Sequence, residues 1–192
     1  MSRLTTFAFL LIASVSALPI PAVAQGGVID SVLLRWREPL AKCQRNEMDG
    51  AIPTDIHAMA HVAMFEAVNA VAGKYQPYIA KIAAAPGSSE TAAAAQAAHD
   101  VIAMTCADQK GAADTLLASS LALVTDSAAR DGGVVVGQKA AAAIIAARSK
   151  SGSVGFDGFF PAATAGVYVP TVRQVGILIS RMTPWEIGRA HV

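Results

Sequence analysis

The sequence predicts an all-α protein: a bundle of about five helices followed by an irregular arm. Alanine, a strong helix former and a weak strand former, is the most frequent residue. Apolar residues recur at spacings of three and four, and after residue 148 the sequence becomes rich in Gly, Pro, Ser and aromatic residues. The chain is 54% hydrophobic and 15% charged, which is too apolar for disorder, and 192 residues suit about one domain.

The first segment, residues 1–24, has the pattern of a signal peptide. Arg3 precedes the uncharged, apolar stretch Leu4–Leu18, and Ala22-Val23-Ala24 forms a small-x-small cleavage pattern. The mature chain would begin at Gln25 in the periplasm or outside the cell, with no stable membrane span. The alternative is a membrane anchor, because the uncharged run 4–24 could cross a bilayer.

Residues 25–148 are predicted to form the helical domain. Apolar spacing, helix-start signals and glycine stops predict helices at 29–42, 53–71, 90–104, 112–124 and 127–148. Pro39 should kink or end the first helix, and Gly73 should stop the second, whose nearly continuous apolar positions favour a central, buried place. The last helix either continues through Gly132-Gly133 or breaks there.

Small residues on the last predicted helix indicate a close helix crossing. Gly133, Gly137 and Ala141 are four residues apart and therefore share one face. Each interior glycine lowers the stability of an exposed helix by about 1 kcal/mol relative to alanine. We therefore expect these glycines to be needed for packing against a neighbouring helix. Charged residues interrupt the segment, so we expect a tight crossing within a water-soluble bundle rather than a membrane dimer.

Residues 149–185 are predicted to be an irregular arm. The arm is rich in aromatic residues, so we expect it to pack against something, which the chain itself need not contain. Two cysteines, Cys43 and Cys106, could form a disulfide in an oxidising compartment, joining two different helices. The alternative is two small buried hydrophobic residues.

No convincing catalytic, cofactor-binding or metal-binding constellation emerges from the residues. His57 and His61 have a spacing at which two imidazoles can share zinc, but spacing suggests no third ligand, and we expect a buried, hydrogen-bonded His61 and a partly solvated His57. Glu66 and Asn69 should anchor neighbouring loops, and His99-Asp100 lacks a nucleophile motif. The net charge of +1, with no basic stripe, makes nucleic acid a disfavoured partner.

The segment His61–Ala70, followed by Tyr75–Tyr78, resembles the N-terminal helical region of bacterial vanadium-dependent haloperoxidase-like proteins, of the type 2 phosphatidic acid phosphatase superfamily. The likeness continues through Ala97–Val101, Gly133–Ala147 and Tyr168–Thr171, and covers most of the mature chain.

The resemblance implies an all-α enzyme whose cationic side chains bind vanadate or phosphate, with a histidine as ligand or nucleophile. Such an enzyme oxidises halide with peroxide or hydrolyses phosphate esters. Its Arg-before-Pro and Ser-Gly-His motifs are absent here, since Ser151-Gly152 is followed by Ser153. No functional residue carries over, and no cofactor is expected in this chain, although vanadate is expected in an intact relative.

The final residues, 186–192, suggest why those motifs are absent. They reverse-translate as GAG ATC GGA AGA GCA CAC GTC, which matches one frame of a common sequencing adapter. We therefore expect the authentic sequence to stop near Trp185, short of a catalytic half that would be this chain's partner. The alternative is a genuine polar tail.

Two functional hypotheses follow from the sequence. The chain is either an inactive N-terminal part of a haloperoxidase-like or phosphatase-like protein, or a complete exported helical interaction module; self-association into a homo-oligomer is left open. A complete module should bury four aromatic residues of the arm, whereas a fragment should leave them without a core to cover. These residues are Phe159, Phe160, Tyr168 and Trp185.

Overall fold

The protein is an all-α bundle, as the sequence predicted. The computed structural model describes residues 28–43, 51–151, 164–166 and 182–185, and within these ranges it contains helices and no strands. The elements are α1 (Val28–Arg35), α2 (Arg37–Cys43), α3 (Ala51–Ala72), α4 (Glu90–Thr105), the short 3₁₀ helix η1 (Ala107–Gln109), α5 (Lys110–Leu121) and α6 (Ser127–Arg148). No described helix is both long enough and apolar enough to span a membrane.

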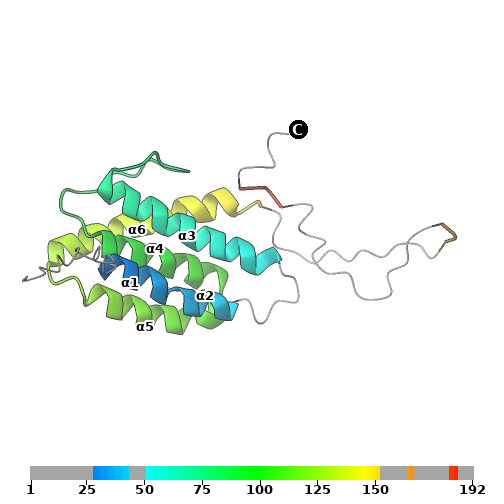
Figure 1. Ribbon diagram of the computed structural model, residues 1–192, viewed down its shortest axis with the longest axis horizontal. Coiled ribbons are helices and arrows are strands. Elements are labelled where there is room, and N and C mark those ends of the chain that lie inside the picture. The colour runs from blue at the N-terminus through cyan, green and yellow to red at the C-terminus, as the bar shows by residue number, and fades with distance from the viewer. Residues whose placement is uncertain (1–27, 44–50, 152–163, 167–181, 186–192) are drawn as a thin grey trace, which may run out of the picture.

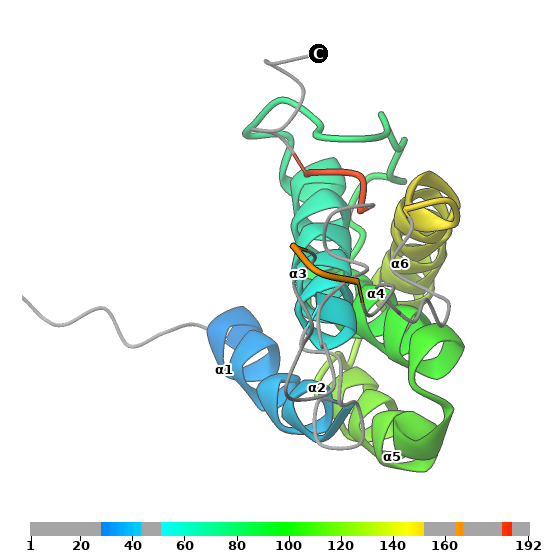
Figure 2. The same ribbon diagram turned by 90° about the vertical axis from the view of Figure 1, so that its right-hand side faces the viewer.

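The alanine-rich helix α4 lies at the centre of the bundle. It packs against α3, α5, α6 and α1 (Figures 1 and 2). Every residue from Ala92 to Ala98 is buried, and all of them except Gln96 are alanine. Such small side chains let neighbouring helices approach α4 from several sides, which explains its central place.

The second predicted helix is therefore not the central one. Helix α3 buries one face, which includes Met59, Ala63 and Ala67, but His61 and Phe65 on its other side are exposed. An apolar pattern covering most of a helix did not distinguish a fully buried helix from one with an apolar outer surface.

Helices α4 and α6 cross closely through the glycine face, as expected. A Cβ atom on Gly137 would lie 2.5 Å from the carbonyl oxygen of Ala93, and one on Gly133 would lie 2.5 Å from that of Ser89. Both contacts are too short for any side chain. Helix α6 continues unbroken through Gly132 and Gly133, so the alternative with a break is wrong.

Local signals account for the end of α3 and the start of α6, but not for the break in the first predicted helix. Gly73 ends α3 with a φ of 64°. Asp126 caps α6 by accepting hydrogen bonds from two backbone N–H groups, at 2.9 and 3.2 Å. The first helix breaks at Trp36 rather than at Pro39, which lies in the first turn of α2. A proline is tolerated there because its missing N–H would have no partner inside the helix.

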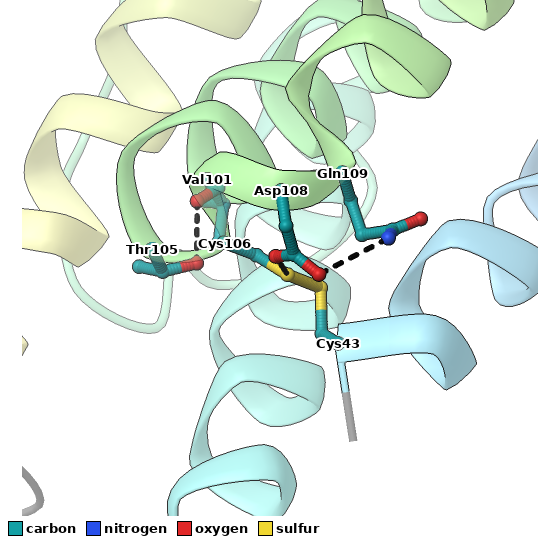
Figure 3. The surroundings of a disulfide bond; sticks show 6 residues. All are labelled: Cys43, Val101, Thr105, Cys106, Asp108 and Gln109. Carbon is teal, nitrogen blue, oxygen red and sulfur yellow. Dashed lines mark hydrogen bonds between the residues drawn. A yellow bond between two sulfur atoms is a disulfide. The ribbon is translucent and has the colours of Figure 1, made fainter. Parts of the chain in front are cut away.

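Cys43 and Cys106 form a disulfide, which decides between the two alternatives for these residues (Figure 3). The bond joins the last residue of α2 to the residue that follows α4; the two cysteines are 63 positions apart in sequence, and their Cα atoms are 5.9 Å apart. The predicted boundaries of the signal peptide (1–24) and of the foreign tail (186–192) lie outside the described residues.

Candidate functional site

The histidine pair on α3 lies at the surface. The rings of His57 and His61 are stacked, with centroids 6.2 Å apart, and Nδ1 of His61 donates to the carbonyl oxygen of His57 at 2.8 Å. His61 is exposed and His57 is half-buried, with a buried Nε2 that has no hydrogen-bond partner, so the expected burial of His61 was wrong. Nowhere in the described ranges do three His, Cys, Asp or Glu residues gather as metal ligands.

Glu66 and Asn69 anchor the chain that follows α3, as the sequence predicted. The Glu66 carboxylate is buried and accepts the backbone N–H groups of Tyr78 and Ile79, at 2.6 and 2.5 Å. Asn69 accepts the N–H of Tyr75 at 2.8 Å and donates to its carbonyl at 2.9 Å. These two polar side chains fold the segment after Gly73 back along α3.

His99 links α4 to α5 through Asp114 and also contacts its neighbour on α4, Asp100. Its Nδ1 lies 2.8 Å from Asp100 and its Nε2 lies 2.7 Å from Asp114, which also pairs with Lys110 at 2.8 Å. The His99 hydrogen bond, and then that of Lys110, lower the pKa of Asp114 below its ordinary value of 3.8. With no hydroxyl or thiol among these partners, the cluster connects two helices and makes no catalytic triad.

The most elaborate polar site is one that sequence reasoning missed. Asp55, near the start of α3, and Arg148, at the end of α6, form an ion pair of 2.7 Å with side chains only 3% and 5% exposed. Ser151 donates to the second Asp55 oxygen at 3.3 Å, and the indole N–H of Trp185 donates to the first at 3.1 Å. We call these four residues the Asp55 node.

The Asp55 node joins the chain just after α6 to the residues around Thr183. Nη1 of Arg148 donates to the carbonyl of Thr183 at 2.7 Å, and the N–H of Thr183 donates to the carbonyl of Ser151 at 2.7 Å. The guanidinium carbon lies 4.3 Å from the centroid of the Trp185 ring, a cation–π contact. The two ends of the segment between 151 and 183 are therefore held together at one end of the bundle.

A pocket of about 410 Å³ adjoins this node and is lined in part by Arg148, Tyr78 and Trp185. Asp55 neutralises the Arg148 guanidinium, and each of its two Nη atoms donates a hydrogen bond. Its Nε is buried without a partner. The arrangement is suited to holding chain segments in place rather than to stabilising a charged transition state.

An apolar pocket lies on the outer face of α3, and we call it the aromatic groove. It has a volume of about 390 Å³ and is lined by Ala58, His61, Val62, Phe65, Tyr78 and Trp185. The hydroxyl of Tyr78 donates to the carbonyl of Trp185 at 2.5 Å, and their rings stack with centroids 6.4 Å apart.

One of the four arm aromatics whose burial separates a fragment from a complete module, Trp185, lines the aromatic groove. Trp185 is half-buried and packs against the hydrophobic core, which at this one residue is the outcome expected of a complete module. The other three of these aromatic residues, Phe159, Phe160 and Tyr168, lie outside the described residues.

Together, the fold and these sites define a disulfide-linked, all-α bundle whose polar clusters join helices and loops. No protein-family model, curated protein or solved structure matches this chain. The protein is therefore assigned to an architecture and not to a family.

Proposed function

We propose that this chain is the helical, non-catalytic N-terminal part of an exported protein similar to vanadium-dependent haloperoxidases or type 2 phosphatidic acid phosphatases. Its role is to hold the segment after α6 in a fixed position from which an oxyanion-binding half continues. The Asp55 node carries this proposal, because it fixes both Ser151 and Thr183 on the bundle.

The chemistry of the described residues supports a scaffold. Binding of vanadate or phosphate needs several uncompensated donors that converge on the anion. In the part of the chain that the structure describes, the buried cation is Arg148, and it is already paired with Asp55. The motif that carries the resemblance supplies Glu66 and Asn69, which both act as loop anchors.

Export is supported by the disulfide. Disulfides persist in oxidising compartments and are rare in the reducing cytosol. Sequencing the N-terminus of the mature protein tests this part of the proposal, since cleavage at the predicted site leaves Gln25 first. A retained Met1 would contradict it.

Activity assays test the scaffold proposal. The purified chain, incubated with vanadate, peroxide and bromide, is expected to brominate no acceptor above the blank, and it should hydrolyse no p-nitrophenyl phosphate. A longer reading frame that includes a Ser-Gly-His segment should gain one of these activities. Turnover by the present chain, or a native stop codon directly after Val192, would overturn the proposal.

A second candidate function is a complete, exported helical interaction module. It is favoured by the aromatic groove, where Phe65 is 40% exposed and Tyr78 is 37% exposed. Light scattering across a range of concentrations separates the two, because a module that associates with itself should change in mass. Replacing Val62 with Asp in the groove should then abolish the change, and an unaltered mass profile would count against self-association.

A further inference from the structure

The Cys43–Cys106 disulfide connects two parts of the bundle and is almost fully buried. The exposed fractions of Cys43 and Cys106 are 4% and 7%. Cys43 ends the α1–α2 pair, and Cys106 lies between α4 and η1. The bond therefore fastens the N-terminal helix pair to the central helix, and any reductant must reach it through a narrow exposed side.

The side chain of Asp108 contacts this disulfide. An oxygen of Asp108 lies 3.1 Å from the sulfur of Cys106, and Asp108 is exposed to solvent (Figure 3). A disulfide sulfur carries no hydrogen, so this is a contact between a carboxylate and the sulfur and not a hydrogen bond.

The short helix η1 holds the carboxylate in place. The backbone N–H of Gln109 donates to the carbonyl of Cys106 at 3.0 Å, which forms the turn that carries Asp108 back over the bond. The side-chain amide of Gln109 donates to the other Asp108 oxygen at 3.2 Å. Figure 3 shows Asp108 lying over the two sulfur atoms, with Gln109 beside it.

The position of this charge matters for thiol–disulfide exchange. A reductant thiolate attacks one sulfur, forms a mixed disulfide and expels the other cysteine as a thiolate. A second reductant thiolate then releases the first cysteine; the two reductant thiols end as a disulfide, and the two cysteine thiolates take up protons from water. An adjacent carboxylate repels the incoming thiolate and also disfavours the thiolate that leaves, so it slows the first step.

We propose that Asp108 is an electrostatic guard of the Cys43–Cys106 disulfide, which slows its reduction by anionic thiols and so keeps the α1–α2 pair fastened to α4. The inference is independent of the proposed scaffold role, because it concerns only the described residues around the bond.

The experiment compares reduction of the folded, full-length protein by two monothiols, anionic mercaptoacetate and cationic cysteamine. Free cysteines are alkylated at intervals and counted by mass. The substitution Asp108→Asn should accelerate reduction by mercaptoacetate about five-fold at low ionic strength, the factor for one unit charge about 4 Å away in water. It should accelerate reduction by cysteamine much less, because the cysteamine ammonium offsets the repulsion of its thiolate and only the effect on the leaving thiolate remains.

Two control variants isolate the charge at this position. Asp131→Asn removes the same charge from an exposed site on α6 and should have no effect on the reduction rate. Asp108→Glu keeps the charge and should retain most of the protection. Equal acceleration of both reductants by Asp108→Asn would indicate loosened packing and overturn the proposal, as would an unchanged rate with mercaptoacetate.

The wild-type protein alone provides a test that needs no variant. Added salt screens the carboxylate, so reduction by mercaptoacetate should become faster and reduction by cysteamine should change less, relative to the same reductants acting on a small-molecule disulfide. Salt responses identical to those of the small-molecule disulfide would refute a guarding charge.

Discussion

At the scale of single residues, the buried ion pair of the Asp55 node is the feature on which the structure most depends. Asp55 and Arg148 are both nearly inaccessible to water, so each is tolerated only because the other neutralises it. The exposed pair of Glu38 and Lys42 has a similar distance of 2.7 Å, but water already solvates both of its partners. Although the two ion pairs have the same distance, we expect the buried pair of Asp55 and Arg148 to matter much more for stability than the exposed pair of Glu38 and Lys42.

The substitution Asp55→Asn is expected to lower the free energy of unfolding by about 3–5 kcal/mol, because it leaves the Arg148 guanidinium buried without a counter-charge. The matched control, Glu38→Gln, breaks an exposed pair and should cost no more than about 0.5 kcal/mol. Urea denaturation followed by circular dichroism measures both changes. Similar losses in the two variants would show that burial does not set the strength of the Asp55 pair.

The cluster around His99 predicts a dependence of stability on pH. Hydrogen bonds from His99, and then from Lys110, lower the pKa of Asp114 in the folded state below 3.8. This contribution to stability is therefore fully present above the pKa of the unfolded chain and is lost as the pH falls through the lower, folded value.

Asp114→Asn should accordingly lower the melting temperature near pH 6 and have a shrinking effect as the pH falls below the ordinary aspartate pKa of 3.8. Because Asp114 is at the surface, the effect should be small and should weaken in salt. Thermal melts of both proteins across an acidic pH series check this, and a constant difference at every pH would exclude the ionised carboxylate as its cause.

At the scale of helices, the α4–α6 contact shows why glycine can stabilise a helix crossing. Replacing glycine with alanine in an exposed helix improves stability by about 1 kcal/mol. At Gly137, however, the new methyl group would meet the carbonyl oxygen of Ala93 at 2.5 Å and the Cβ of Gln96 at 2.7 Å. Backbone is the obstacle, so the two helices would have to separate.

We expect Gly137→Ala to destabilise the protein by about 1–3 kcal/mol, the usual cost of overpacking. Gly111→Ala, at the start of α5, is the control: nothing lies within 4 Å of its added Cβ, so stability should stay the same or rise by up to about 1 kcal/mol. Denaturant midpoints measure both. If Gly137→Ala is stabilising, the close crossing does not constrain α6.

Local signals explain which helix features the sequence could predict. Gly73 stops α3 and the last helix spans Ser127–Arg148 as expected, since a glycine stop or an N-cap is encoded within a few residues. Helix α5 begins two residues before the predicted position 112 and ends three residues before 124.

The Asp55 node could not be predicted in the same way. Trp185 reaches Asp55 across 130 positions, and only the packed bundle brings them together. Nothing in the sequence near Asp55 signals a buried partner at Arg148. The pairing of Cys43 with Cys106 likewise stayed one of two alternatives until their helices were placed.

At the scale of the whole molecule, two long-range connections hold the bundle together. The Asp55 node ties the end of α6 to α3 and to Thr183, whereas the disulfide ties the α1–α2 pair to α4. The first depends on an intact fold, because only the folded chain brings Asp55 and Arg148 together across 93 positions of sequence. The second is covalent and also restricts the unfolded chain.

Removing the disulfide should therefore act mainly through the unfolded state. A cross-link that closes a loop of this size, 63 positions in sequence, contributes about 4 kcal/mol in the chain-entropy treatment, and measured values are typically about 2–4 kcal/mol. The double variant Cys43→Ala/Cys106→Ala should lose stability in that range while keeping its helix content, because Val32, Trp36 and Leu40 still bury the α1–α2 pair. Urea denaturation of this variant and of the oxidised protein measures the difference. A much larger loss, accompanied by exposure of Trp36 without denaturant, would mean that apolar packing alone does not hold the helix pair on α4.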